Sequence, residues 1–336
     1  MKKIKTILRS AAAFAVTICM LAPLSACSGK KDTVMSLGSF DVSLEHYRYL
    51  YLNIRRELEE PGINEDKLDA DVRDIVMQSL RHTAAVKNMA DERKISLSND
   101  QKKEISDYIK GLEEIYSGKD ELEKELAAEY LDEDFLKYAT ELQQLEVLLR
   151  EKMTSEYGGE VAADDKTVEA DIKQNFYFAS QILLSAENTS SDEKAELASQ
   201  LLERAKNGED FSALVEQYSE DTSEDPRCFT SGQLIEEFEN AVKNMKPGEI
   251  YPDVVESEAG LHIIKRLELT DEYIDEHFSE LREAYTARRF NEEVEKCANS
   301  LEIEEKECYG DISTENLLSY ITQTTDTSDT LPEKYS

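Results

Sequence analysis

The hydrophobic spacing of this 336-residue chain changes twice, and that change limits the folds it can adopt. Apolar residues recur every three or four positions in four segments before residue 155, and the same spacing returns after residue 270. Each apolar face of this kind must be buried against another element. The four N-terminal segments cover residues 44–54, 69–93, 98–115 and 132–154. We therefore expect a helical region over 34–155, all-α apart from a short extended piece at 34–40, and a C-terminal helix over 269–309 that packs back on it.

A different pattern occupies the stretch between these helical regions. The glycine pair at 158–159, together with the acidic residues up to 165, predicts a linker over 156–171. Beyond it, short apolar and β-branched runs alternate with helical segments, and residues 219–232 form a polar loop. This order predicts an α+β domain over 172–268, with a small antiparallel sheet and helices, inserted between the two helical parts. Residues 310–336 are expected to hold a short helix and a disordered tail.

The N-terminus predicts export from the cytoplasm. The first nine residues carry four basic side chains and no acid, and an apolar stretch too short to span a bilayer follows. It ends in Leu24-Ser25-Ala26-Cys27, which resembles the lipobox of bacterial lipoproteins. That resemblance implies a signal peptide over 1–26, a lipid on Cys27, a tether over 27–33 and a place at the extracytoplasmic face of the cell membrane. An ordinary secretory signal that ends near a cysteine is the alternative.

The charge and the missing motifs exclude several classes of function. The chain has 73 acidic and 39 basic residues, a formal net charge of -34, so a nucleic acid would be repelled. No Lys/Arg stripe stands against this acidic background. The sequence has no His-x-x-x-His, Cys-x-x-Cys, Gly-x-Gly-x-x-Gly or Walker motif. We predict no metal, no cofactor and no nucleic-acid partner.

Six short motifs stand in one order within the predicted α+β domain. They are residues 179–184 (ASQILL), 207–214 (NGEDFSAL), 218–221 (YSED), 232–241 (GQLIEEFENA), 246–250 (KPGEI) and 260–265 (GLHIIK). Together they resemble a parvulin-type peptidyl-prolyl cis-trans isomerase domain. The export signal, the helical N-terminal region and the trailing helix resemble the PrsA/SurA-like extracytoplasmic foldases of bacteria. Isomerisation of an X-Pro bond crosses a barrier of about 18–20 kcal/mol and breaks no covalent bond.

The resemblance implies an apolar site for the proline ring. Leu234 and Phe238 match the family's pocket floor, and Phe229 is predicted as a third substrate-binding residue. Such a pocket would grip the ring and exclude water, which favours the twisted and less polar amide.

The resemblance also implies a polar group beside the rotating bond. Asp221 stands where the family has an acidic or thiol side chain, and His262 matches the second of two pocket histidines. Gln181 occupies the place of the first histidine. A glutamine amide both donates and accepts hydrogen bonds, so it can still bond His262. The predicted catalytic residues are His262, Asp221 and Gln181.

Two hypotheses about function follow from this site. In the first, the chain is a lipid-anchored foldase that isomerises X-Pro bonds in unfolded or newly secreted proteins. In the second, it is a chaperone or peptide-binding lipoprotein whose parvulin domain no longer turns over substrate. Gln181 and a loop between Asp221 and Phe229 that is shorter than usual favour the second. A solute-binding or adhesion lipoprotein would leave the order of the motifs unexplained.

Overall fold

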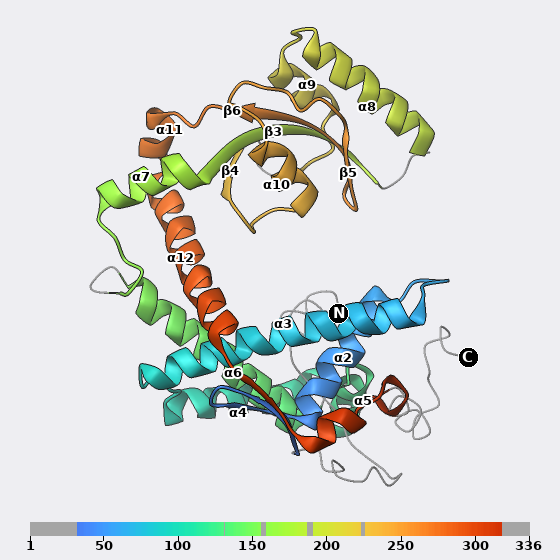
Figure 1. The fold of residues 1–336 in the computed structure, drawn as a ribbon, viewed down its shortest axis with the longest axis vertical. Coiled ribbons are helices and arrows are strands. Elements are labelled where there is room, and N and C mark those ends of the chain that lie inside the picture. Colours follow the sequence, from blue (N-terminus) through green and yellow to red (C-terminus); the bar gives the residue numbers. More distant parts are fainter. Residues whose placement is uncertain (1–31, 131, 156–158, 187–190, 223–225, 318–336) are drawn as a thin grey trace. The chain divides into compact units, whose positions relative to one another are not determined.

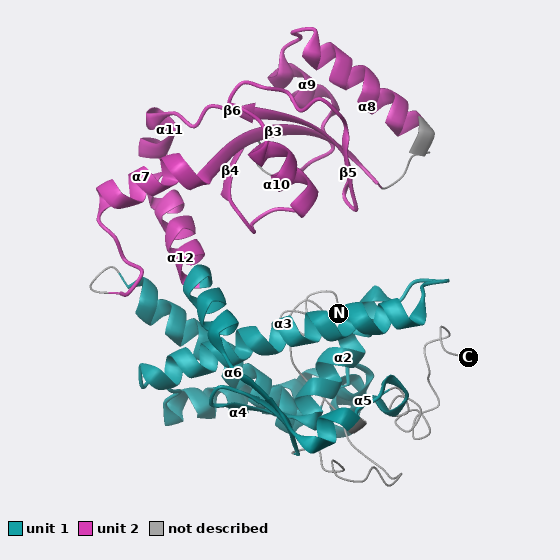
Figure 2. Cartoon of the chain, in the orientation of Figure 1, with its two compact units in different colours: residues 1–155, 291–336 teal, residues 156–290 magenta. Residues whose placement is uncertain are grey.

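The computed structural model describes residues 32–130, 132–155, 159–186, 191–222 and 226–317. The chain divides into two compact units (Figure 2): residues 1–155 with 291–336 form unit 1, and residues 156–290 form unit 2. The predicted signal peptide, Cys27 and the predicted tail beyond residue 317 lie outside the described residues.

Unit 1 is built mainly from helices (Figure 1). They are α2 (Leu44–Leu58), α3 (Glu65–Glu92), α4 (Asn99–Ile115), α5 (Lys119–Ala128) and α6 (Glu133–Thr154). All four predicted helices are present, and α5 is a fifth that the apolar spacing did not indicate. The side chain of Ser98 accepts the Gln101 N–H, and Gln101 in turn accepts the Ser98 N–H, so both form the capping box that begins α4.

Unit 1 also contains a small sheet, so the prediction of an all-α N-terminal region is wrong in this detail, although residues 34–40 were expected to be extended. Strands β1 (Thr33–Leu37), β2 (Phe40–Ser43) and β7 (Ile303–Glu305) pair antiparallel in the order β2-β1-β7. Strands of three to five residues are too short to show a clear alternation in the sequence. The pairing of β1 with β7 joins segments more than 260 residues apart, which only tertiary packing can bring about.

The C-terminal part of the chain packs on the N-terminal helices of unit 1, as predicted. Helix α12 (Phe278–Ser300) ends in this unit, where the Arg81 guanidinium donates to the Ala298 carbonyl at 2.9 Å. Cys308 and Leu317 are buried in the same apolar core as α2 and α3. The α+β class with an inserted domain is confirmed.

His46 makes the stability of unit 1 depend on pH. Its imidazole is completely buried, and the rings of Phe40, Phe135 and Tyr138 meet it edge-on. Burial lowers its pKa to about 3. In the unfolded chain it takes up a proton near its ordinary pKa of about 6.5, so its contribution is complete above that pH and is lost as the pH falls. We expect the free energy of unfolding in urea to fall between pH 7 and pH 5 by about 2 kcal/mol more for wild type than for His46→Phe.

Comparison with the variant removes the contribution of the carboxylates, which both proteins share. Leu68→Ala provides the control because Leu68 is fully buried in the same core and has no titrating group, so it is expected to keep the wild-type pH dependence. Equal losses in wild type and His46→Phe would contradict the prediction.

Unit 2 is a four-stranded antiparallel sheet with helices on both faces (Figure 1). The strands are β3 (Phe176–Ser185), β4 (Arg227–Thr230), β5 (Val255–Ser257) and β6 (Gly260–Leu267), in the order β4-β3-β6-β5. One face packs against α8 (Ser191–Lys206) and α9 (Phe211–Tyr218), and α10 (Glu236–Lys243) covers the other. Side chains alternate between these faces along each strand. Ile182 and Ile263 therefore pack under α8 and α9, whereas Ala179 and Ile264 pack under α10.

Two elements of unit 2 lie where the sequence predicts irregular chain. Strand β4 lies within the predicted loop 219–232 and pairs with residues 176–179 of β3. Helix α7 (Asp165–Asn175) occupies much of the predicted linker, capped by the Asp164 side chain. The segment is acidic and follows a glycine pair, so its two apolar positions, Val168 and Ile172, give no clear helical pattern in the sequence. Tertiary packing buries both side chains. The prediction of a linker over residues 165–171 is therefore wrong.

A third apolar cluster in unit 2 explains why α7 is helical. Val168, Ile172 and Phe176 pack against residues that follow the sheet in sequence, in α11 (Asp271–Glu276) and the first half of α12. Those partners are Ile274, Leu281 and Tyr285. The compact unit thus extends beyond the predicted range 172–268 on both sides.

Candidate active site

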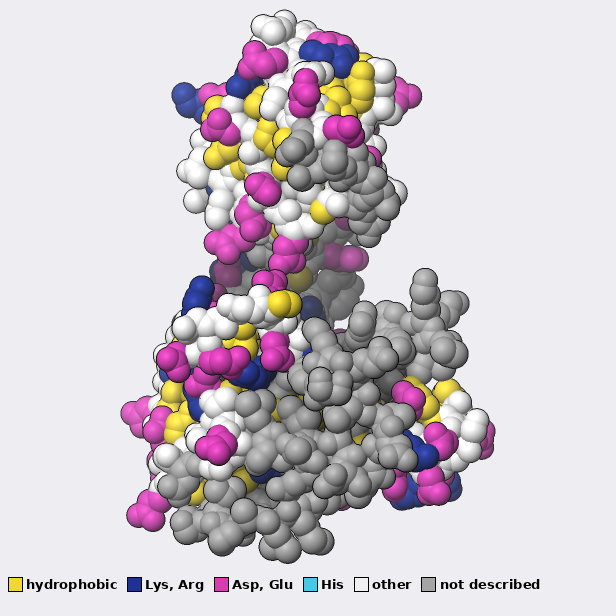
Figure 3. Space-filling model, turned by 90° about the vertical axis from the view of Figure 1, so that its right-hand side faces the viewer, with side chains coloured by type: hydrophobic (Ala, Val, Ile, Leu, Met, Phe, Trp, Pro, Cys, Tyr) yellow, Lys and Arg dark blue, Asp and Glu magenta, His cyan; other side chains and the backbone are white. Residues whose placement is uncertain are grey.

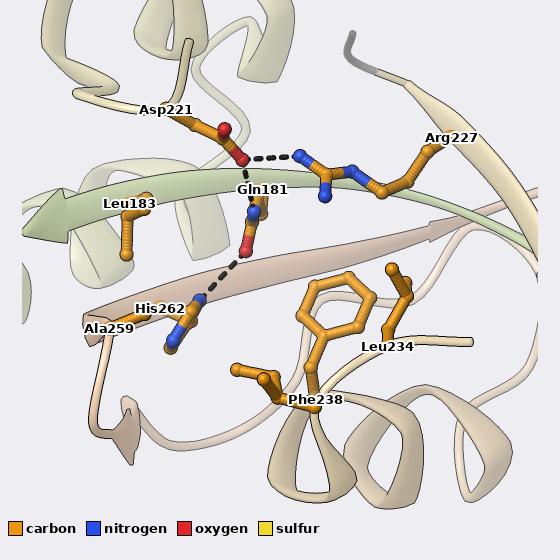
Figure 4. Close-up of a pocket in the computed structure, with 9 residues that line it drawn as sticks. Gln181, Leu183, Asp221, Arg227, Leu234, Phe238, Ala259 and His262 are labelled. Carbon is orange, nitrogen blue, oxygen red and sulfur yellow. Dashed lines mark hydrogen bonds and ion pairs between the residues drawn. The ribbon is translucent and has the colours of Figure 1, made fainter. Parts of the chain in front are cut away.

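A cavity of about 200 Å³ opens on the α10 side of the sheet in unit 2 (Figure 4). It is lined by Gln181, Leu183, Asp221, Arg227, Leu234, Ile235, Phe238, Ala259 and His262. Five of the six predicted pocket residues are in this set. The sixth, Phe229, does not line the cavity, and its ring lies behind Phe238 with centroids 5.7 Å apart.

Strand register brings the two central polar side chains together. In the antiparallel pair β3–β6, Leu183 lies opposite His262 and Gln181 opposite Ile264. Residues two apart point to the same face, so Gln181 and His262 are diagonal neighbours on the α10 side. Both are buried, and His262 Nδ1 is 2.8 Å from Gln181 Oε1. The predicted bond between these side chains is present in the structure.

The hydrogen bonds continue from Gln181 to the opposite wall of the cavity. Gln181 Nε2 donates to Asp221 Oδ2 at 2.5 Å, and the Arg227 guanidinium bonds the same carboxylate oxygen (Figure 4). A carboxylate accepts only, so the amide must present its NH2 group to Asp221 and its oxygen to His262. The imidazole therefore carries its proton on Nδ1.

The far side of the imidazole agrees with this tautomer. His262 Nε2 is 2.7 Å from Ser257 Oγ, and Ser257 Oγ accepts the Ala259 N–H at 3.1 Å. The serine hydroxyl is thus free to donate to Nε2, which accepts. Burial lowers the pKa of His262 below its usual value, although the Asp221 carboxylate opposes the change. A neutral histidine at the centre of an ordered hydrogen-bond chain is the result.

The apolar half of the cavity is formed by the segment around α10. Phe238 is 2 % exposed and presents its ring to the His262 imidazole at 6.2 Å, with 64° between the planes. Leu234 lies half-buried beside it, and Ile235 is 42 % exposed at the edge. This floor excludes water from one side of a bound ring and leaves the polar chain on the other.

The carboxylate of Glu239 holds the loop that carries Leu234. It accepts the backbone N–H groups of Gly232, Gln233 and Leu234 at 2.8–3.0 Å and bonds Lys243 Nζ at 2.7 Å. Burial by itself would raise the pKa of Glu239, but Lys243 and these N–H groups outweigh it and place the pKa below its usual range. The side chain therefore stays charged and fixes the loop.

The sequence reasoning missed three polar residues of this site: Arg227, Ser257 and Glu239. No local pattern marks Ser257, which reaches His262 only because β5 pairs with β6. Glu239 directly follows Phe238, and an acid in the first turn of a helix is common, so its burial is not visible in the sequence. Arg227 could have been found as the nearest cation to Asp221 in the chain.

No metal or membrane element is found in the described part of the chain. Within those residues, no group of three or more His, Cys, Asp or Glu side chains is placed to hold a metal ion. None of the described helices is both long and apolar enough to cross a membrane.

Comparison with known proteins identifies the class that this sheet and cavity define. Residues 164–270 match the family of PPIC-type PPIase domains. This segment is therefore similar to parvulin-type peptidyl-prolyl isomerase domains, as the order of the motifs predicted. Over longer stretches the chain is similar to PrsA and SurA foldases.

Two foldases and one chaperone illustrate the relationship. Foldase protein PrsA 3 of Bacillus cereus is 33 % identical over 186 residues, which cover 52 % of this chain and 62 % of that protein. Foldase protein PrsA of Caldanaerobacter subterraneus is 26 % identical over 80 % of this chain and 85 % of its own length. Chaperone SurA of Nitrosococcus oceani is 31 % identical over 37 % of this chain and 30 % of its own. The chain thus spans about three fifths of the first of these relatives.

Solved structures of PrsA proteins are also similar to the chain. The structure of PrsA from Bacillus anthracis is 22 % identical, covers 66 % of this chain and 94 % of its own, and has a TM-score of 0.29. That of PrsA from Bacillus subtilis is 19 % identical, with 91 % and 96 % covered and a TM-score of 0.27.

Proposed function

We propose that this protein is an extracytoplasmic foldase that isomerises X-Pro bonds in exported proteins. The observation that carries the proposal is the unbroken hydrogen-bond chain through His262, Gln181 and Asp221, which runs beside the apolar floor of a cavity of about 200 Å³. The proposal includes a lipid anchor on Cys27, supported by the residues Leu24-Ser25-Ala26-Cys27. At that surface, exported chains emerge unfolded and are exposed to slow prolines and aggregation.

The cavity suits a reaction in which no covalent bond is broken. The X-Pro amide resists rotation because its C–N bond has partial double-bond character, and the twisted amide loses that character. Phe238 and Leu234 would hold the pyrrolidine ring in a water-excluding site, which favours the less polar twisted form. Arg227 has N–H groups on the polar wall that can donate to the carbonyl oxygen as it turns. No proton transfer is required.

Gln181 supports turnover in this arrangement because its side chain links His262 to Asp221 through hydrogen bonds. Its amide joins a neutral histidine to a carboxylate without leaving either one unsatisfied. The alternative, a chaperone that binds proline segments without isomerising them, is favoured by the change from histidine to glutamine and by the shorter loop between Asp221 and Phe229.

Gln181→Leu tests the hydrogen-bond chain. The substitution leaves His262 Nδ1 and one bond of the Asp221 carboxylate unmatched in a partly buried site, a loss of about 1–3 kcal/mol. We expect kcat/KM for an Ala-Pro peptide to fall by about tenfold or more, and Gln181→His to keep or raise it. The measurement is isomerisation of the peptide by the full chain, followed by NMR exchange.

Gln200→Leu is the matched control because Gln200 is an exposed glutamine on α8, under the other face of the sheet. It is expected to behave as wild type. Equal rates for wild type and Gln181→Leu would remove the hydrogen-bond chain from the mechanism. If wild type shows no rate above background and Gln181→His restores one, the binding-only chaperone is the correct function.

A further inference from the structure

The charges that line the cavity cancel one another. Of the nine lining residues, Asp221 and Arg227 are ionised, and they form an ion pair. The third titratable residue, His262, is neutral in its hydrogen-bond chain. The lining itself therefore attracts neither an acidic nor a basic substrate.

The edge of the cavity, in contrast, is acidic. Glu236 and Glu237 are exposed in the first turn of α10, next to the lining residues Ile235 and Phe238. Glu258 is exposed and directly precedes Ala259, another lining residue. Glu237 is close enough to act on the site, since its charge opposes the effect of burial on the pKa of His262.

Other acids near these segments are already engaged or point elsewhere. Glu220 bonds Lys194 and the Ser185 N–H, and Glu239 bonds Lys243. Glu256 alternates along β5 with two residues whose side chains meet the cavity face, so it points to the opposite face. Among the residues that the structure describes, the exposed glutamates 236, 237 and 258 remain as the net charge around the opening.

We infer that the pocket selects X-Pro segments flanked by lysine or arginine and discriminates against segments flanked by acidic or phosphorylated side chains. This inference rests on the proposed function. A proline ring on Phe238 places its neighbouring residues at the edge of the cavity, where Glu237 and Glu258 lie. Opposite charges attract there and like charges repel, while the paired Asp221 and Arg227 contribute no net charge.

The experiment compares three peptides that differ only in the residue before proline: Lys, Ala and Glu. We expect kcat/KM to fall in the order Lys, Ala, Glu, with a ratio of about three- to tenfold between the first and last at low salt. The ratio should approach one at about 0.5 M salt, because exposed charges are screened.

Variants with reversed charge test whether Glu237 and Glu258 cause the preference among the peptides. The double variant Glu237→Lys with Glu258→Lys is expected to reverse the order of the peptides. Asp and Glu are also scattered over the face drawn in Figure 3, with fewer Lys and Arg among them. The control must therefore change the total charge equally at a distance. Glu196→Lys with Glu203→Lys does so on α8, at exposed positions under the other face of the sheet, and should keep the wild-type order.

The outcomes separate the inference from the proposed function. Turnover of the Ala-Pro peptide with no difference between Lys and Glu overturns the inference alone, as does a ratio that both double variants change equally. No turnover of any peptide overturns the proposed isomerase activity. Binding of the same peptides, measured by chemical shifts of His262, then decides: tighter binding of Lys-Pro than Glu-Pro supports the inference, and equal or reversed affinity overturns it. Tighter binding of a phosphoserine-Pro peptide also overturns it.

Discussion

Phe238→Ala is expected to lower kcat/KM for proline peptides by about 10- to 100-fold while the domain remains folded. Phe238 lines the cavity and is 2 % exposed, so its ring forms part of both the pocket floor and the core under α10. Truncation removes the surface that a proline ring would contact and admits water beside His262. It also leaves a cavity in the core, which costs about 3–5 kcal/mol of stability.

Loss of stability and loss of the pocket must be told apart. Phe211→Ala provides the matched control because Phe211 is also buried in unit 2 but lies at the start of α9, on the other face of the sheet. Both variants should lower the urea midpoint of unit 2 by similar amounts. Only Phe238→Ala should lower kcat/KM at a temperature where both proteins are folded. Equal activity of the two variants would mean that Phe238 is not the floor of the substrate site.

A fragment of residues 172–268 is expected to be far less stable than a fragment of residues 160–290. The shorter range matches the predicted domain but removes four of the six buried residues of the third apolar cluster. Those four are Val168, Ile274, Leu281 and Tyr285. Each buried side chain of this kind contributes about 1.5–3 kcal/mol, and a whole domain is stable by only about 5–15 kcal/mol. The shorter fragment should therefore lack a cooperative thermal transition.

One ion pair and one point variant bear on the same comparison of fragments. Arg288 and Asp171 are paired in a partly buried position between α12 and α7, which ties these helices together within unit 2. Leu281→Ala should lower the free energy of unfolding of the longer fragment by about 2–5 kcal/mol. The stability of this variant should then lie between the stabilities of the two fragments. Calorimetry of all three measures the difference. Equal melting temperatures for the two fragments would show that α7, α11 and α12 add nothing to the domain.

Much of the fold and of the site followed from local patterns in the sequence. Helices with wide apolar stripes were predicted correctly because the spacing of three and four residues reports directly on one buried face. Gln181 and His262 were placed in one pocket from the order of the motifs, and the strand register confirms that they meet. The floor residues Leu234 and Phe238 were found in the same way.

The parts that the sequence did not reveal depend on partners far away in the chain. Strand β4, strand β7 and helix α7 have few apolar positions of their own, so each is stabilised by what it packs on rather than by its local pattern. Phe229 was predicted as a third substrate-binding residue of the pocket. The sheet instead turns it behind Phe238.

The sequence by itself determined the helical stripes, the inserted α+β domain and the residue types available to the site, and it predicts an export signal. Only the tertiary structure decided which of those residues meet. Strand pairing brings Ser257 to His262 and Arg227 to Asp221. The buried carboxylate of Glu239 holds the loop beside them through backbone N–H groups. The physical reason is that a hydrogen bond depends on distances of about 3 Å between atoms, whereas sequence spacing constrains positions only within one helix or strand.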